Sequence, residues 1–171
     1  MDDRTLYLVV TGASSPRESV ADLVRQARER EWAVTVICSP MGTRFHDVHE
    51  LAGISGDRVR VDFRLPGTGE RLLPPDALLA CPLTFNSLNK IASGFTDTMA
   101  VAVACEMLGH GVPTVCVPHL NGPLARHPAA GASVQTLRGM GARVLFDPDA
   151  PTEDRLPQWK DVLEAVDSAA G

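Results

Sequence analysis

The segment that most limits the fold is a short apolar run that stops at a proline and leads into a helix. The run Ala77–Cys81 is typical of a strand buried in a parallel sheet. Proline lacks the backbone N–H that a sheet uses, so we expect the strand to end before Pro82. Asn86 or Ser87 is predicted to cap the following helix. In an α/β sheet this edge is where ligands bind, although a connection with no ligand is the alternative.

The same order of strand, loop and helix recurs along the chain. Six apolar or alternating runs are predicted as strands: 5–10, 33–38, 59–63, 77–81, 114–117 and 144–146. Helical spacing of apolar residues predicts helices over 17–30, 43–52, 96–108, 132–140 and 158–169. Residues 64–75 are rich in proline and glycine, which predicts a long loop that is functional or mobile. Strands that alternate with helices predict a doubly wound parallel sheet in a single α/β domain.

Composition and charge narrow the classes of function. A chain of 171 residues with 44% hydrophobic content suits one domain with a sizeable core, and no apolar run reaches the length of a transmembrane helix. The net charge of −5, with both signs interspersed, argues against a nucleic-acid surface. Residues 1–4 lack the features of a signal peptide. We therefore expect a cytoplasmic protein that binds neither nucleic acid nor membranes.

The four cysteines give no sign of a metal or redox site. Cys38, Cys81, Cys105 and Cys116 form no C-x-x-C pair, so neither a zinc site nor a redox dithiol is predicted. Three of them end strand-like runs, and we expect buried free thiols.

Small or polar residues follow four of the predicted strands, in the loops 11–15, 39–43, 82–87 and 118–121. Because the carboxyl ends of parallel strands meet at one edge of a sheet, we expect these loops to lie together. The loop Thr11-Gly12-Ala13-Ser14-Ser15 can direct N–H groups and hydroxyls onto a phosphate. Its one glycine is a weaker signal than G-x-G-x-x-G, and a plain helix cap is the alternative.

Residues 82–97, PLTFNSLNKIASGFTD, carry the most specific resemblance. They resemble the P-x-x-x-N-T motif, and the K-I-A-x-G-I-x-D that follows it, in the flavin-containing cysteine decarboxylase family. This family groups phosphopantothenoylcysteine decarboxylase with the peptidyl-cysteine decarboxylases of lantibiotic-type peptide biosynthesis. Residues 11–14 resemble the family's flavin-phosphate loop, 39–45 resemble a segment beside the phosphate and flavin, and 118–121 resemble its substrate-facing motif. The resemblance covers about residues 5–150.

The resemblance implies a flavodoxin/Rossmann-like fold, a bound FMN and a homo-oligomer, either a trimer or a dodecamer. The whole chain, 1–171, would then be one FMN-binding domain. The residues expected to contact FMN are Thr11, Gly12, Ala13, Ser14, Ser39, Thr43, Phe45, Pro82, Leu83, Thr84 and Asn86. Asn86 is also the expected catalytic residue, and Leu120 and Asn121 are the expected substrate-binding residues. No metal is expected.

Three departures from the family pattern bear on activity. The family's active-site histidine would fall near Thr68 or on Arg60, and neither is histidine. His119 is the best-placed substitute base, with a surface or capped histidine as the alternative reading. The motif methionines and tryptophan are Leu120, Leu124 and Ala125, which indicates an altered substrate pocket. The loop 147–157 also lacks the cysteine with which the coenzyme A enzyme reduces its enethiol.

These features favour an FMN-dependent cysteine decarboxylase, a lyase. The expected reaction is oxidative decarboxylation of the C-terminal cysteine of a ribosomal precursor peptide to an aminoenethiol, as in aminovinyl-cysteine formation. Two alternatives stay open. One is phosphopantothenoylcysteine decarboxylase. The other is a non-catalytic FMN-binding protein, which the missing histidine supports.

Overall fold

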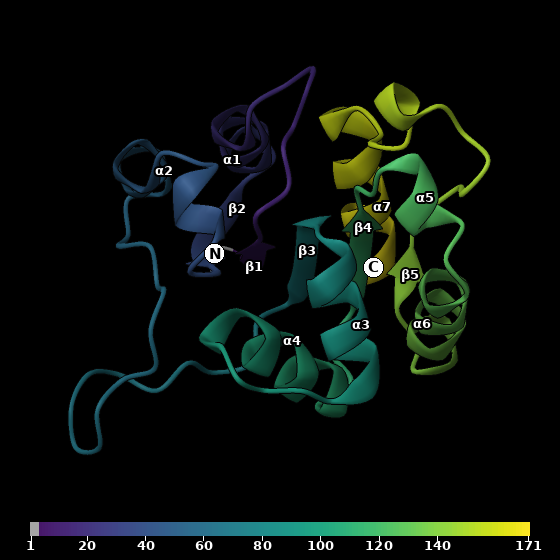
Figure 1. Ribbon diagram of the computed structural model, residues 1–171. Helices are drawn as coiled ribbons and strands as arrows, with labels where there is room; N and C mark the ends of the chain where they lie inside the picture. Colours follow the sequence, from purple (N-terminus) through teal and green to yellow (C-terminus); the bar gives the residue numbers. More distant parts are fainter. Residues whose placement is uncertain (1–3) are drawn as a thin grey trace.

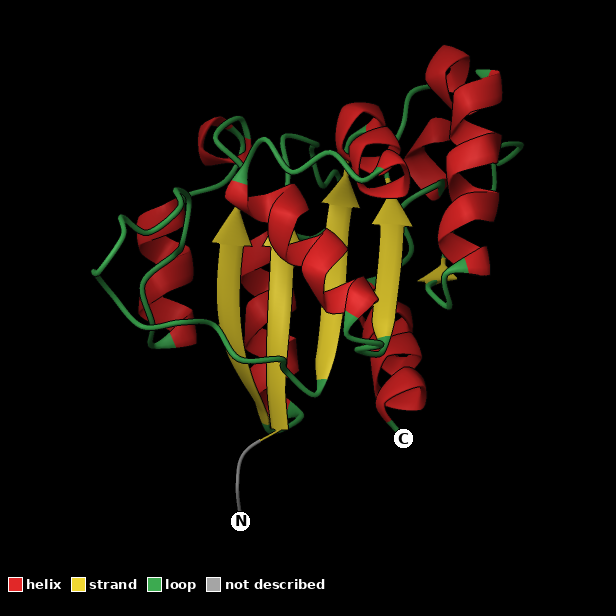
Figure 2. Cartoon of the chain, turned by 90° about the horizontal axis from the view of Figure 1, so that it is seen from below, coloured by secondary structure: helices red, strands yellow, loops and turns green. Residues whose placement is uncertain are grey.

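Five parallel strands form the sheet of the computed structural model, which describes residues 4–171 (Figure 1). They are β1 (Arg4–Val10), β2 (Trp32–Cys38), β3 (Ala77–Leu83), β4 (Thr114–Pro118) and β5 (Arg143–Val144). Their order across the sheet is β2-β1-β3-β4-β5, and Figure 2 shows the arrowheads of the long strands β1 to β4 at one end. The predicted doubly wound parallel sheet is therefore confirmed. Residues 1–3, which entered the prediction of location, lie outside the described residues.

Helices cover both faces of the sheet. They are α1 (Val20–Glu29), α2 (Val48–Ser55), α3 (Phe85–Ser93), α4 (Met99–Gly109), α5 (Gly122–Ala125), α6 (Pro128–Gly139) and α7 (Trp159–Ala170). Side chains alternate across a strand, so Leu6 and Leu8 of β1 pack against α1 and α7, while Tyr7 and Val9 pack beneath α3 and α4 (Figure 1). Within residues 4–171, no helix combines the length and apolar character needed to cross a bilayer.

The strand predicted over 59–63 is wrong except at one residue. Arg60 forms a single parallel bridge to Ile37 on the open side of β2. Its N–H donates to the Val36 carbonyl at 2.9 Å, and its own carbonyl accepts from Cys38 at 2.8 Å. Beyond Arg60 the chain leaves the sheet, and residues 62–71 are exposed. The alternating pattern thus marks a brief edge contact, and the sheet has five strands instead of six.

The end of β3 also differs from the prediction. The strand continues through Pro82 to Leu83, because the missing N–H falls where the register between β3 and β4 shifts. The cap of α3 is Thr84, whose Oγ1 accepts from the Ser87 N–H at 3.1 Å. Asn86 and Ser87 were predicted as caps, and they lie in the first turn instead. The strand therefore ends two residues later than predicted and the helix cap lies two or three residues earlier, so Thr84 directly follows the strand.

Local caps account for the other shifted helix starts. Ser19 and Asp22 form a capping box, so α1 begins at Val20 and not at Arg17. Asp47 caps α2, and the predicted helix over 43–52 divides into a 3-10 turn, η1 (Gly42–Arg44), and α2. The α3–α4 connection is closed by an ion pair at 2.6 Å between Lys90 and Asp97. The lysine and aspartate of the family-like string thus fix the path of the chain.

Candidate functional site

Thr11 joins the loops that follow β1 and β3. Its side chain is fully buried, and its Oγ1 donates to the Pro82 carbonyl at 2.8 Å while accepting from the Thr84 N–H at 3.0 Å. The backbone N–H of Thr11 also donates to the Pro82 carbonyl, at 3.3 Å. Since the only hydroxyl hydrogen is used in this way, the Thr11 side chain holds two loops together and does not donate to a ligand.

The loop after β2 lies against the end of β1. Ser39 donates its backbone N–H to the Val10 carbonyl at 2.9 Å, and its Oγ accepts from the Gly42 N–H at 3.0 Å. The Ser39 hydroxyl hydrogen remains available to a ligand, whereas Thr43 donates its own to the Pro40 carbonyl at 2.7 Å. A Cβ on Gly42 would lie 2.7 Å from Cys38 Sγ and 3.1 Å from the Val10 carbonyl oxygen. Glycine is required for this close approach.

His46 belongs to the same cluster, although the sequence analysis gave it no role. Its Nε2 lies 3.1 Å from the Thr11 carbonyl oxygen, so Nε2 carries the hydrogen and donates. Burial lowers the pKa of His46, despite its hydrogen bonds to the Thr11 and Ala13 carbonyls, which raise it. The neutral ring therefore supports the loop after β1. The one feature of the sequence that could have pointed to His46 is its place directly after Phe45.

His119, the predicted substitute base, lies at the end of β4. Its backbone N–H donates to the Leu83 carbonyl at 2.9 Å, and its Nδ1 lies 2.8 Å from the Ser14 carbonyl oxygen. Nδ1 must carry the hydrogen in this contact, which leaves the lone pair on Nε2. The half-buried ring thus joins the loops after β1 and β4 and still offers one nitrogen as a base.

The two predicted asparagines are exposed at the same edge. Asn86 lies in the first turn of α3, and Asn121 caps α5 through its Oδ1, which accepts from the Leu124 N–H at 3.0 Å. The Asn121 amide nitrogen finds no acceptor among residues 4–171 and can donate to a substrate. Leu120 is only 2% exposed, so its side chain packs in the core and does not line an open pocket.

The loop after β1 fits a phosphate group. The backbone N–H groups of Gly12 and Ser14 find no acceptor within the described part of the chain, and the Ser14 side chain is exposed. With the free hydroxyl hydrogen of Ser39, they form the kind of donor set that binds phosphate. At the start of α1, Ser19 Oγ accepts from the Asp22 N–H and the Asp22 carboxylate accepts from the Ser19 N–H. That carboxylate makes the end of α1 less favourable for a phosphate than the loops.

A hollow of about 270 Å³ opens between the loops after β1 and β2. Ser14 and Ser15 line one side, and Phe45, His46 and Asp47 line the other. The Phe45 ring is 52% exposed, which leaves it free to contact a planar ligand. Ala13, Pro82 and Leu83 are buried behind this edge, so they can shape the site mainly through their backbone.

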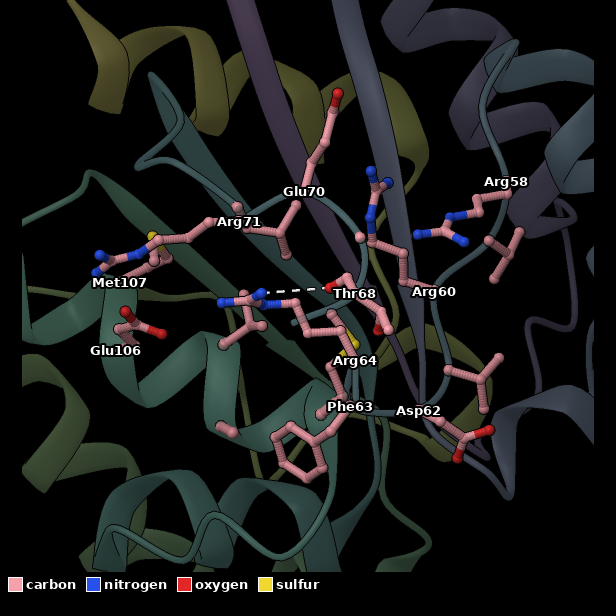
Figure 3. A pocket seen from close by; sticks show the side chains of 17 residues that line it. Arg58, Arg60, Asp62, Phe63, Arg64, Thr68, Glu70, Arg71, Glu106 and Met107 are labelled. Carbon is pink, nitrogen blue, oxygen red and sulfur yellow. Dashed lines mark hydrogen bonds between the residues drawn. The ribbon is translucent and has the colours of Figure 1, made fainter. Parts of the chain in front are cut away.

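A larger cavity, of about 680 Å³, lies beyond β2, between residues 58–72 and α4 (Figure 3). Arg60 and Thr68 both line it, and these are the two positions at which the family resemblance places a histidine. Arg58, Arg64 and Arg71 also line it, and none of the three forms an ion pair with a described carboxylate. This arginine cavity is separate from the hollow at the carboxyl edge.

The cysteines and the acidic residues add no further site. Cys38, Cys81 and Cys116 are buried free thiols, as predicted, and burial raises the pKa of Cys38 to about 11. Such thiols stay protonated at neutral pH and are poor nucleophiles and metal ligands. Within residues 4–171, no group of three or more His, Cys, Asp or Glu is placed to hold a metal ion.

The model of one protein family, described as Flavoprotein, matches residues 1–171. The chain belongs to the Flavoprotein family. A curated relative is the coenzyme A biosynthesis bifunctional protein CoaBC of Thermococcus kodakarensis, which is 29% identical over 150 residues. That match covers 83% of this chain and only 36% of the relative, so the chain spans about a third of its length.

Two solved structures show the same fold. The FMN-dependent cysteine decarboxylase SpaF superposes with a TM-score of 0.78 at 21% identity, covering 99% of this chain and 98% of SpaF. The peptidyl-cysteine decarboxylase EpiD gives a TM-score of 0.71 at 16% identity, covering 95% of this chain and 98% of EpiD. Membership in the Flavoprotein family supports the predicted FMN cofactor, and these two neighbours, at under 25% identity, show the fold.

Proposed function

We propose that this protein catalyses the FMN-dependent oxidative decarboxylation of a peptide's C-terminal cysteine to an aminoenethiol. When bound, FMN would supply the two-electron oxidation of the cysteine side chain and pass the electrons to oxygen. The substrate would lose CO2 and two hydrogens. The observation that carries the proposal is that four strand-end loops bond to one another at one edge of the sheet, in a chain of the Flavoprotein family. Asn86 and Asn121 are exposed on the segments that follow two of these strands.

Residues of different loops have different roles in the proposed reaction. The N–H groups of Gly12 and Ser14 and the Ser39 hydroxyl would hold the phosphate. Asn86 would donate a hydrogen bond to the negative charge that develops as CO2 leaves. Asn121 would bind the substrate through its free amide nitrogen. We propose the Nε2 of His119 as the base, because the Ser14 carbonyl fixes the tautomer that leaves its lone pair free.

The remaining predicted contacts have secondary parts in this proposal. Phe45 would border the flavin ring, together with the backbone of Pro82–Thr84. Thr11 would act by joining the loops, and Thr43 would have to give up its bond to the Pro40 carbonyl before it could donate to a phosphate. Ala13 and Leu120 would contribute backbone groups, because both side chains are buried.

Phosphopantothenoylcysteine decarboxylase is the second candidate, and the CoaBC relative favours it. The reaction would be the same loss of CO2, followed by reduction of the enethiol. The loop between β5 and α7 contains no cysteine to carry out that reduction. We therefore place the peptide reaction first. A non-catalytic flavoprotein is the third reading, and it rests on the replacement of the family histidine by Arg60 or Thr68.

Mass spectrometry of Cys-terminated peptides incubated with the purified protein in air tests the proposal. We expect loss of CO2 and two hydrogens from some members of a varied peptide set. Loss of CO2 without the two hydrogens, from phosphopantothenoylcysteine alone, would favour the second candidate. No change in any substrate, with flavin clearly bound, would favour the non-catalytic protein.

Substitution of Asn86 tests its role within that reaction. Asn86→Asp removes the amide donor, and we expect turnover to fall about a hundredfold, since donors to a developing anion contribute on this scale. Asn89→Asp is the matched control, because Asn89 lies on the same helix but accepts a hydrogen bond from Ser133 at 2.7 Å. Full turnover by Asn86→Asp with normal flavin content would remove Asn86 from the mechanism.

We also propose that the protein forms homo-oligomers. Phe63, Leu65 and Leu73 are 55%, 71% and 71% exposed on the segment that extends beyond β2. Exposed apolar side chains grouped on one segment commonly mark an interface. Light scattering after size exclusion should give a mass above that of one chain, and Leu65→Ser with Leu73→Ser should lower it.

The cytoplasmic location stays a prediction.

A further inference from the structure

A buried arginine, Arg155, lies in the loop between β5 and α7. Its side chain is 5% exposed, and the sequence analysis gave it no role. One terminal nitrogen donates to the Leu120 carbonyl at 3.0 Å and to Thr152 Oγ1 at 2.9 Å, and the other donates to the Pro148 carbonyl at 3.3 Å. A single side chain therefore joins its own loop to the turn that follows β4.

The charge of Arg155 is not balanced by a neighbouring acid. All three acceptors are neutral, and no carboxylate of residues 4–171 forms an ion pair with Arg155. Its Nε is also buried and finds no acceptor in the described chain. Burying an unpaired charge is unfavourable, and departures of this kind concentrate at functional sites. Arg155 is thus more than a packing residue.

The carbonyl that Arg155 binds lies between two proposed site residues. His119, before Leu120, is held by the Leu83 and Ser14 carbonyls. Asn121, after Leu120, is held through its Oδ1 by the Leu124 N–H. The Leu120 carbonyl, which belongs to the peptide group that joins Leu120 to Asn121, accepts a charge-assisted hydrogen bond from Arg155. The direction of the Asn121 amide therefore depends on Arg155.

We propose that Arg155 is a positioning residue that fixes the turn 119–121 against the loop 148–152. Rotation of the Leu120 peptide plane would move both neighbouring side chains, so the contact sets where Asn121 can donate to a substrate. This inference rests on the proposed function for its effect on turnover. The positioning itself is a property of the folded chain and can be measured without substrate.

Amide hydrogen exchange, followed residue by residue by NMR, tests the positioning directly. In Arg155→Gln, which removes the charge and most donors, we expect the Leu124 amide to exchange at least tenfold faster, because it is bonded to the Asn121 side chain. The Ser39 amide, bonded to Val10, should not change. Arg143→Gln is the matched control, because Arg143 is exposed and forms no ion pair among the described residues.

Steady-state kinetics on a Cys-terminated peptide give a second, separate measurement. For Arg155→Gln we expect a tenfold lower kcat/KM at unchanged flavin content, and for Arg155→Lys, which keeps the charge and some donors, a loss of about threefold. Should the Gln variant fail to fold, the Lys variant carries both measurements, and a threefold faster Leu124 exchange is expected. Wild-type exchange and kinetics in a folded variant would overturn the proposal. If wild-type protein shows no decarboxylation, exchange alone still decides whether Arg155 positions the turn.

Discussion

At the carboxyl edge of the sheet, most polar side chains contact another loop, whereas around the arginine cavity beyond β2 most charged side chains extend into solvent. Thr11, His46 and His119 each bond a carbonyl of a different loop. Arg58 and Arg71 are exposed and form no ion pair with any described acid. The carboxyl edge is thus preorganised, while the larger cavity has few fixed contacts. Volume alone would have favoured the arginine cavity over the proposed site.

The largest loss of stability is expected at Gly42, where the close packing of the carboxyl edge leaves no space for a side chain. Gly42→Val would place a branched side chain against Cys38 Sγ and the Val10 carbonyl oxygen, which a Cβ alone approaches to 2.7 and 3.1 Å. Overpacking of this kind should lower the free energy of unfolding by about 3 kcal/mol. Urea unfolding measures it, and flavin absorbance reports the expected loss of bound cofactor.

Gly53→Ala is the control for this substitution. Gly53 lies within α2, and a Cβ there would meet nothing within 4 Å. Alanine in a helix interior should raise stability, by about 0.5–1 kcal/mol. If Gly42→Val is as stable as wild type, the close approach of the loops after β1 and β2 is not a fixed feature, and the comparison between the two regions loses its first support.

The second-largest loss of stability is expected when a buried hydroxyl is removed, and one threonine in each region gives the comparison. Thr11→Val keeps the shape but removes the bonds to the Pro82 carbonyl and the Thr84 N–H, leaving buried groups unpaired. We expect a loss of about 2 kcal/mol in the free energy of unfolding. Thr68→Val, in the cavity segment, removes a bond to the Leu65 carbonyl that is exposed to water, and should cost under about 0.5 kcal/mol. Equal losses would show that the two regions are equally fixed.

The sequence predicted β1, β2, β3 and β4 closely because each contains an apolar run, whereas the alternating run 59–63 forms only a single bridge. It predicted the edge at which the loops meet, since parallel strands place all their carboxyl ends together. It missed His46 and Arg155, because each joins its own loop to another by a bond to a backbone carbonyl 35 residues away, and backbone groups leave no signal in side-chain spacing. It also overestimated Leu120, whose motif position suggested a pocket side chain while its apolar character buries it.

The third expected effect is a dependence of the free energy of unfolding on pH, which arises from His46 at the carboxyl edge. Burial lowers the pKa of His46 below its ordinary value of 6.5, so the unfolded chain binds a proton more readily than the folded protein. Stability contributed by the neutral ring should therefore fall as pH drops from about 7.5 to 5.5. The aspartates with lowered pKa values, such as Asp22 and Asp97, lose their contribution near and below 3.8, outside this window.

Two glutamine variants isolate this effect. His46→Gln can still donate to the Thr11 carbonyl but does not titrate, so its stability should change less between pH 7.5 and 5.5 than that of wild type. His49→Gln should keep the wild-type dependence, because His49 is exposed on α2. Urea unfolding at both pH values gives the comparison. Identical pH dependence in wild type and His46→Gln would mean that the ring gains no stability from being neutral.

The smallest effect is expected in the arginine cavity. The triple variant Arg58→Gln, Arg64→Gln and Arg71→Gln removes three exposed cations, and only Arg64 bonds a protein group, the Thr68 carbonyl at 3.3 Å. We expect a change within about 0.5 kcal/mol per residue in the free energy of unfolding, because such surface substitutions break no buried contact.

Arg60→Gln is the contrasting variant within the same cavity. Arg60 pairs with Asp57 at 2.6 Å and is 18% exposed, so its loss should cost more than that of any single exposed arginine, up to about 1 kcal/mol. A larger loss in the triple variant would show that the cavity is as tightly built as the carboxyl edge. Unchanged stability with lost turnover would break the comparison in another way, since a region outside the proposed site would then act in the same reaction, which in an oligomer it can do across a subunit boundary.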